Sequence, residues 1–288
     1  DGRRLAAFGR YAGIVGAYNG VRAYGLKYDL FELPKAETLH DQPELIEELR
    51  KIRLPNIKIL ITGRGRVGNG IKEMLDAMGV RKVVLADYLK LAYDEPVYCR
   101  IDAAEYNKRK DGKRGGRIDF YTNASEYKSN FARFSKVTDF YISGHFYSDN
   151  GSPYLFTRED ARHPDFKIRV VADVSCDIDG PIASTIRAST IEDPIYGYDP
   201  ITESETDFRD PNAIAVMAVD NLPCELPRDA SVGFGESFLR KVIPAFFNGD
   251  KDGILERARM TRDGKLTEHY AYLQDYVEGT EQELAVGK

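Results

Sequence analysis

The sequence contains few of the side chains that build metal centres or disulfide frameworks. Its three cysteines, Cys99, Cys176 and Cys224, are far apart and form no C-x-x-C pair. This spacing is typical of free thiols in a reducing compartment. The four histidines show neither H-x-x-x-H nor H-E-x-x-H spacing. We therefore predict no metal site.

Long apolar runs and an excess of positive charge are also missing. No run approaches the roughly 18 apolar residues of a membrane span, and no basic segment followed by an apolar one marks a signal peptide. The 41 Lys and Arg residues against 46 Asp and Glu residues give a net charge of −5. This charge provides no general attraction to nucleic acid or to an anionic membrane. We expect a soluble, cytoplasmic protein with a small-molecule substrate and without nucleic-acid or membrane partners.

The most informative stretch runs from Ile57 to Gly70 and predicts a buried strand, a glycine turn and the start of a helix. Within it, Gly63, Gly65 and Gly68 match the G-x-G-x-x-G pattern of dinucleotide-binding folds. The first glycine permits the tight turn, the second lets the backbone approach a pyrophosphate, and the third lets the helix pack closely on the strand. The N-terminus of the helix can then hold the phosphates.

Two arginines flank this turn. Arg64 and Arg66 either contact a phosphate or remain solvated loop cations. Arg66 and Val67 open the predicted helix. We include both of them among the cofactor-binding residues.

The segment after this helix predicts the next strand, over residues 82–87. It ends at Asp87, which follows Gly68 by 19 residues. A carboxylate at this position would receive the adenosine ribose hydroxyls. It would favour NAD over NADP, because the 2′-phosphate of NADP would meet a like charge.

Three further segments predict buried strands of the same parallel sheet. They cover residues 137–144, 168–174 and 213–219. In a doubly wound sheet the loops at the carboxyl ends of the strands face the ligand. The cofactor-binding residues predicted at these ends are Gly144, Asp173, Val174 and Leu222, and Asp220 leaves the last strand beside them.

Four side chains at these strand ends have two interpretations. His145 stands where a catalytic histidine could lie, but a loop histidine bonded to the backbone is the favoured interpretation. The side chains of Asp173, Asp177 and Asp179 alternate as calcium ligands can, yet no bidentate glutamate follows at loop spacing. We attribute these carboxylates to turn formation and to the lining of the crevice.

The remaining segments predict helices and one basic loop. Residues 4–25, rich in alanine, glycine and aromatic residues, predict a tightly packed helix, and residues 43–52 predict a short amphipathic one. Residues 108–117 carry lysines and arginines without interleaved aromatic residues, which is typical of a solvated loop rather than of a polyanion site. Helices are predicted at 234–247 and over most of 254–277.

Several separated segments resemble one family. Besides the glycine turn they are residues 2–16, 172–177, 189–194 and 219–230. With these segments the chain is similar to the saccharopine dehydrogenases, both the NAD-dependent lysine-forming enzyme and the lysine–ketoglutarate reductase module. These belong to the wider alanine dehydrogenase and transhydrogenase superfamily. The resemblance implies that hydride leaves the secondary-amine carbon of saccharopine for NAD, and that water then splits the imine into lysine and 2-oxoglutarate.

The resemblance also implies roles for two residues. Arg4 matches the family arginine that binds a substrate carboxylate, which a bidentate guanidinium suits. Asp220 matches an acid near the nicotinamide and the amine, and we predict that it is catalytic. The catalytic lysine and histidine of the family precede the segment that matches residues 3–16. We therefore expect further residues upstream of Asp1.

We predict an α/β protein with a doubly wound parallel sheet of the Rossmann type. Residues 14–221 would form the NAD-binding domain, and residues 1–13 and 222–288 would form part of a substrate lobe. An alanine dehydrogenase-like or opine-type amino-acid dehydrogenase is the nearest alternative. A non-catalytic NAD-binding protein is another, since the same fold serves many functions.

Overall fold

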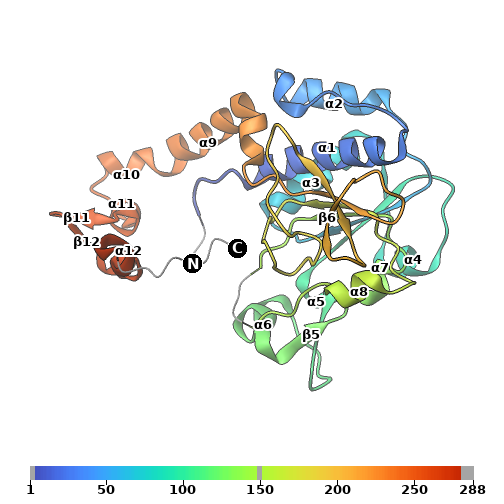
Figure 1. Cartoon of the computed structure of the whole chain (residues 1–288). Coiled ribbons are helices and arrows are strands. Elements are labelled where there is room, and N and C mark those ends of the chain that lie inside the picture. The colour runs from blue at the N-terminus through green and yellow to red at the C-terminus, as the bar shows by residue number, and fades with distance from the viewer. Residues whose placement is uncertain (1–3, 148–150, 280–288) are drawn as a thin grey trace. The chain divides into compact units, whose positions relative to one another are not determined.

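The chain forms a large compact unit and a small one. The computed structural model describes residues 4–147 and 151–279. Phe8–Ser231 form the larger unit, and Asp1–Ala7 together with Val232–Lys288 form the smaller one. Both are drawn in Figure 1. The glycine turn and every strand of the main sheet lie in the larger unit.

The larger unit is built on an eight-stranded sheet with the order β2-β3-β1-β6-β7-β10-β8-β9. Neighbours from β2 to β10 run parallel, and β8 and β9 add antiparallel strands at one edge. The strands are β1 (Lys58–Thr62), β2 (Arg81–Lys82), β3 (Val97–Ile101), β6 (Phe140–Ser143), β7 (Val170–Asp173), β8 (Ile195–Asp199), β9 (Ser204–Thr206) and β10 (Ile214–Met217). The predicted α/β class with a mostly parallel sheet is confirmed.

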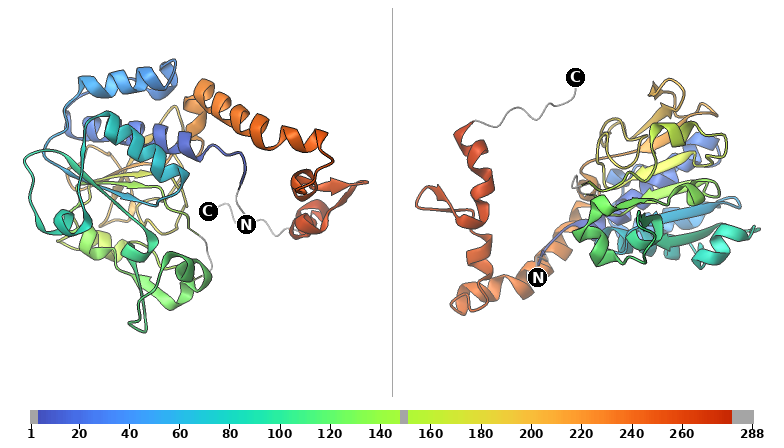
Figure 2. Two further views of the ribbon diagram at one scale, coloured as in Figure 1. Left: turned by 180° about the vertical axis from the view of Figure 1, so that it is seen from behind. Right: turned by 90° about the horizontal axis from the view of Figure 1, so that it is seen from below.

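Both faces of the sheet are covered, because its central strands are apolar on both sides. In β1, Ile59 and Ile61 belong to one hydrophobic core and Leu60 belongs to the other. Helices α1 (Gly9–Tyr28), α2 (Gln42–Lys51) and α3 (Arg66–Ala77) lie on the first face (Figures 1 and 2). The second core receives side chains from α4 (Leu85–Lys90), α5 (Ala103–Tyr106), α6 (Arg117–Thr122), α7 (Ala132–Ser135) and α8 (Arg158–Arg162).

Helix α1 runs through the middle of the first face, and 14 of its 20 residues are buried. It packs backbone to backbone on α3, since a Cβ built on Gly13 would lie 2.0 Å from the Val67 carbonyl oxygen. A Cβ on Gly70 would likewise lie 2.0 Å from the Arg10 carbonyl oxygen. The predicted tightly packed helix is confirmed, although it begins at Gly9. Neither α1 nor any other helix of the described ranges is long and apolar enough to cross a membrane.

The basic segment 108–117 lies in an excursion between β3 and β6. Strands β4 (Asn107–Arg109) and β5 (Tyr127–Ser129) pair antiparallel there, beside the 3-10 turn η2 (Ala124–Glu126). The Arg109 guanidinium contacts the carboxylates of Asp111 at 3.0 Å and Asp119 at 2.8 Å, and also that of Glu126. Part of the positive charge of this segment is therefore neutralised within the excursion itself.

The smaller unit has almost no core of its own. Among residues 232–279, Ala245 is the only buried residue. Its elements are α9 (Pro227–Lys241, which begins in the larger unit), α10 (Ile243–Phe247), α11 (Ile254–Ala258), β11 (Thr261–Arg262), β12 (Lys265–Leu266), the 3-10 helix η4 (Glu268–Leu273) and α12 (Gln274–Glu278). Residues 1–3 and 280–288 of the predicted substrate lobe lie outside the described residues.

Two helix predictions in this unit are wrong in detail. The predicted helix 234–247 is divided after Lys241, next to Pro244, which has no amide to donate to the helix. The predicted helical stretch 254–277 contains the hairpin of β11 and β12. Asp263 and Gly264 make its turn with positive φ angles of 51° and 75°, as tight hairpins require.

Candidate functional site

The glycine turn between β1 and α3 is closed around two of its glycines and open at the third. Gly63 has a φ of +93°, and a Cβ built on it would lie 2.2 Å from the Gly144 carbonyl oxygen. A Cβ on Gly68 would lie 2.2 Å from the Gly63 carbonyl oxygen. Around Gly65, no heavy atom of the described residues beyond its own neighbours lies within 4 Å of a built Cβ. The turn thus has the shape that a pyrophosphate needs, with open space at its second glycine.

Helix α3 starts directly at this open position. Gly65 is its N-cap and provides no side chain, so the cap forms no side-chain hydrogen bond. The first amides of any α-helix lack partners within the helix, and the helix dipole favours an anion there. Arg66 is exposed and Val67 is half-buried in this first turn. The geometry therefore fits the predicted phosphate contacts of these residues, which stay predictions.

Arg100 braces the turn from the neighbouring strand β3. Its Nε donates to the Gly63 carbonyl oxygen at 2.8 Å, and its Nη1 donates to Asn69 Oδ1 at 2.8 Å. Its Nη2 lies 3.4 Å from the Gly65 carbonyl oxygen. Sequence reasoning missed this residue. The available signal was a cation placed within the otherwise buried segment 97–101.

The predicted strand through Asp87 is wrong. Strand β2 ends at Lys82, and Asp87 is exposed in the first turn of α4. Moreover, β2 does not lie next to β1, because β3 is inserted between them. The carboxylate that follows the strand beside β1 is Asp102. In a dinucleotide-binding fold this position, and not the edge of the sheet, faces the adenosine ribose.

Charged groups of both signs surround Asp102. Its Oδ1 accepts from the Ala103 amide at 2.8 Å, so it caps α5, and the Glu105 carboxylate accepts from the Asp102 amide at 2.5 Å. The Arg117 guanidinium lies 3.9 Å from Asp102 Oδ2. The Arg64 guanidinium lies 3.3 Å from Glu105. These arginines would also be near a 2′-phosphate, so we predict that the charge of the Asp102 carboxylate decides the choice between NAD and NADP.

Replacing Asp102 by asparagine should therefore relax this choice. Asparagine also caps helices well, so α5 should remain formed. We expect the ratio of the NADPH to the NADH dissociation constant to fall about tenfold, because the repulsion of the 2′-phosphate is removed. Titrations that follow NAD(P)H fluorescence measure both constants. The matched control is Asp87→Asn; a change of the ratio in that variant alone would assign the ribose to Asp87.

At the end of β6, Gly144 and His145 lie directly behind the turn. The Gly144 amide donates to the Thr62 carbonyl oxygen at 3.0 Å. His145 Nδ1 lies 3.0 Å from Thr62 Oγ1, whose other partner is the Tyr141 hydroxyl at 2.8 Å. Burial lowers the pKa of His145 to about 4, so the ring is neutral. Its partner is a side chain rather than the backbone that was expected.

The Asp173 carboxylate holds the ends of β6 and β7 together. It is fully buried and accepts hydrogen bonds from the side chains of Ser143 at 2.5 Å, Ser175 at 2.6 Å and Thr185 at 2.7 Å. The amides of Ser175 and Cys176 donate to it at 3.1 Å. Because both of its oxygens are engaged by the protein, its side chain shapes the crevice from behind.

Val174 and Leu222 meet behind the crevice at α1. A Cβ built on Gly16 would lie 2.3 Å from Val174 Cγ2 and 3.3 Å from Leu222 Cδ1. Leu222 opens the 3-10 helix η3 (Leu222–Glu225) and is 2% exposed, while Val174 is half-buried. Their predicted contact with a cofactor stays a prediction, and the structure brings the two side chains together.

Beyond β7, a cavity of about 440 Å³ opens at the same edge of the sheet. Its lining residues are Tyr147, Tyr154, Cys176, Asp177, Ile178, Asp179 and Gly180. Burial, assisted by the neighbouring Asp173, raises the pKa of Asp177 to about 6. A carboxyl group that changes its charge near neutral pH can accept and return a proton. From the sequence alone, Asp177 is expected only to form the turn and to line the crevice.

Asp220 and Cys176 lie on the neighbouring strand ends. Asp220 is exposed and follows β10. The Cys176 thiol donates to the Ala218 carbonyl oxygen at 3.1 Å. Burial and the charges of Asp173 and Asp220 raise the pKa of Cys176 to about 12, so its sulfur is a neutral thiol. The carboxyl edge therefore presents the carboxylates of Asp177 and Asp220 around an inert cysteine.

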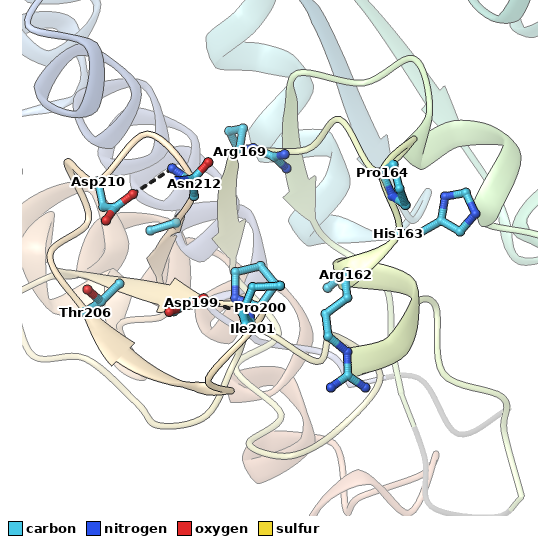
Figure 3. A pocket seen from close by; sticks show the side chains of 12 residues that line it. Arg162, His163, Pro164, Arg169, Asp199, Pro200, Ile201, Thr206, Asp210 and Asn212 are labelled. Atoms are coloured by element: carbon cyan, nitrogen blue, oxygen red, sulfur yellow. Dashed lines mark hydrogen bonds between the residues drawn. The ribbon is translucent and has the colours of Figure 1, made fainter.

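Two further features are Arg4 and a second cavity. Arg4 is exposed and belongs to the smaller unit. A second cavity of about 300 Å³ lies at the opposite edge, where β7 and β10 begin (Figure 3). Its charged groups have partners in the chain: Arg162 pairs with Glu203 at 2.8 Å, and Asp210 accepts from the Asn212 amide at 2.8 Å. Because this cavity lies at the opposite edge of the sheet, it is remote from the glycine turn.

The fold and the turn define a Rossmann-type α/β protein with a dinucleotide-binding geometry. No protein-family profile matches the chain. Its sequence is nevertheless similar to those of saccharopine dehydrogenases and alpha-aminoadipic semialdehyde synthases. The predicted resemblance is thus confirmed.

The relatives align with most of this chain at low identity. Alpha-aminoadipic semialdehyde synthase of Arabidopsis thaliana is 24% identical over 94% of this chain and 29% of its own length. The lysine-forming saccharopine dehydrogenases [NAD(+)] of Neurospora crassa and Candida glabrata are 26% and 27% identical over 84% and 92% of this chain. The chain spans 57% and 66% of their lengths. An L-alanine dehydrogenase structure shares the fold, with a TM-score of 0.54 and 16% identity over 94% of this chain and 63% of its own.

Proposed function

We propose that the chain is the nucleotide-binding part of an NAD(H)-dependent oxidoreductase that interconverts saccharopine with lysine and 2-oxoglutarate. The observation that carries the proposal is the glycine turn, open at Gly65, in a chain whose sequence aligns with saccharopine dehydrogenases over most of its length. The bound NAD would accept hydride from the carbon of the C–N bond, or return it as NADH.

The residues of the chain would bind and orient the reactants. Gly63, Gly65 and Gly68, with Arg66 and Val67, would hold the pyrophosphate at the start of α3. Gly144 and the segment held by Asp173, with Val174 and Leu222, would support the nicotinamide half. A carboxylate at Asp102 would receive the adenosine ribose, in place of the predicted Asp87.

Asp177 and Asp220 would serve the chemistry at the amine. Both follow strands whose carboxyl ends face the crevice, and Asp177 lines its cavity. Asp177 has the pKa of a group that can take the amine proton as hydride leaves and return it in the reverse direction. Asp220 would orient the amine and the nicotinamide by its charge.

The smaller unit would belong to a substrate lobe, together with Arg4 as the ligand of a substrate carboxylate. We propose that residues 1–13 and 222–288 contribute to this lobe. The exposed large apolar side chains of this unit support the proposal, since surfaces of this kind are normally covered in a working protein. They include Val232, Leu239, Phe246, Phe247, Met260, Tyr272, Tyr276 and Val277.

A cytoplasmic location of the protein also stays a prediction.

NADH oxidation tests the proposed reaction. The protein is mixed with NADH and either lysine plus 2-oxoglutarate or pyruvate plus ammonia, and absorbance at the nicotinamide band is followed. We expect oxidation with the first pair only, with saccharopine as the product detected by mass spectrometry. Oxidation with the second pair would indicate an alanine dehydrogenase-like enzyme. NADH binding without oxidation by either pair would favour a non-catalytic NAD-binding protein.

A further inference from the structure

Helix α1 holds the segment before β10 through Lys27. Lys27 is 6% exposed, and its Nζ donates to the carbonyl oxygens of Phe208, Asp210 and Ala213, each at 2.9 Å. All three acceptors precede Ile214, where β10 begins. The entry of the strand is thereby fastened to the C-terminal half of α1.

Two turns earlier on the helix, Asn19 holds the segment after β10. Its Nδ2 donates to Glu225 Oε1 at 2.8 Å, and the two side chains are 4% and 2% exposed. Glu225 closes η3, which starts two residues after Asp220. Helix α1 therefore holds both ends of β10. The segment that follows β10, residues 218–225, is called the exit segment below, and it carries the candidate catalytic carboxylate of Asp220.

We propose that Asn19 and Glu225 are positioning residues, which hold the exit of β10 against α1 and thereby keep the Asp220 carboxylate at the cofactor edge. The role of Asp220 in this statement rests on the proposed function. The fastening of the exit segment is a property of the chain alone. It can be measured without substrate or cofactor.

Burial favours the neutral form of the Glu225 carboxyl group, whereas the hydrogen bond from Asn19 favours its carboxylate form. Burial raises the pKa of Glu225 from its ordinary value of 4.5 to about 7. Glu37 in η1 (Ala36–Thr38) adds to this effect, while Arg22 on α1 and Lys35 before η1 oppose it. A buried carboxylate needs several donors, whereas a neutral carboxyl needs fewer. Opening of the exit segment lets Glu225 return to its ordinary pKa, so the segment should open more readily as pH rises.

Amide hydrogen exchange of a peptide covering residues 219–226 measures this opening. After correction for intrinsic exchange, we expect protection in the native protein to fall about tenfold per pH unit between pH 5 and 7 and to level off above pH 7. The Glu225→Gln variant keeps the acceptor and has no charge to gain. Its protection should therefore be independent of pH. The Asn19→Ala variant should lose protection at every pH, because the buried acceptor has lost its donor.

The matched control is Glu47→Gln, which makes the same change on the exposed surface of α2 and should behave as the native protein. Protection in Asn19→Ala equal to that of the native protein would overturn the proposal, and the same pH slope in Glu225→Gln as in the native protein would remove Glu225 from it. Turnover of the same samples separates the positioning role of Asn19 and Glu225 from the proposed reaction. If exchange behaves as expected, kcat should fall in Asn19→Ala and be retained in Glu225→Gln, with the KM for NADH unchanged in both. Absence of turnover in all samples, with the expected exchange, would reject only the proposed reaction.

Discussion

Replacing Gly63 by alanine is expected to lower the free energy of unfolding by about 2–4 kcal/mol and to abolish measurable NADH binding. The φ of +93° is costly for any residue with a side chain, and the new Cβ would lie 2.2 Å from the Gly144 carbonyl oxygen. The turn would have to move away from β6 to accommodate it. Denaturant titration measures the stability, and NADH fluorescence measures the binding.

The matched control for this variant is Gly65→Ala, in the same turn. The built Cβ of Gly65 meets open space, so we expect a change in stability of less than about 1 kcal/mol. The added methyl group would occupy the space that the pyrophosphate needs, and NADH affinity should fall at least about tenfold. Equal stability losses in the two variants would contradict the geometry described for the turn. Unchanged NADH affinity in Gly65→Ala would show that the phosphates lie elsewhere.

Replacing Asp177 by asparagine should lower kcat by about 10²–10³-fold, because the group that takes the amine proton would be lost. The dissociation constant of NADH should stay within about threefold of the native value. In the oxidative direction, the native rate should fall as pH drops through about 6, where Asp177 becomes protonated. This acidic limb should be missing from the residual activity of the variant. Initial rates with saccharopine and NAD between pH 5 and 8 provide the comparison.

Stability gives a second readout for Asp177 that does not depend on turnover. The folded protein holds the proton of Asp177 more tightly than the unfolded chain, so stability is lost as pH rises from the ordinary pKa of 3.8 to about 6. The Asp177→Asn variant has no proton to lose, and at pH 8 it should therefore unfold at a higher denaturant concentration than the native protein. The control is Asp179→Asn, in the same loop, where Asp179 is exposed and pairs with Arg158 at 3.0 Å. Loss of turnover in the control alone would move the catalytic role to Asp179.

The central part of the sheet could be predicted from the sequence because both of its faces are buried. Strands such as β1, β6 and β10 then appear as short continuous apolar runs. The glycine turn was equally clear, since its three glycines follow one of these runs. The same reasoning failed at Asp87. Val83 and Leu85 resemble a strand in composition, but Val84 is 67% exposed and α4 begins at Leu85.

What the sequence could not provide was the order of the strands. The position of Asp102 beside β1 depends on β3 lying between β1 and β2, which is a long-range arrangement. Burial and contacts between distant residues also determine three further features that the sequence does not reveal. These are the side-chain partner of His145, the hydrogen bonds from Arg100 to the glycine turn and the elevated pKa of Asp177. Helical periodicity was also an unreliable guide in the smaller unit. The apolar side chains of that unit pack on almost no core, so their spacing does not report a buried helix face.

The central place of α1 has a consequence for the order in which the chain can fold during synthesis. Within this chain α1 is made before the other described helices and strands, yet it packs on β6, β7 and β10 as well as on α3. Its Asn19 is separated from Glu225 by 206 positions. Contacts of such high separation form late, because a long loop must close first. On the ribosome, the part of α1 that packs on β7, β10 and η3 therefore stays uncovered until most of the larger unit has emerged, and chaperones that shield apolar segments would find a target there.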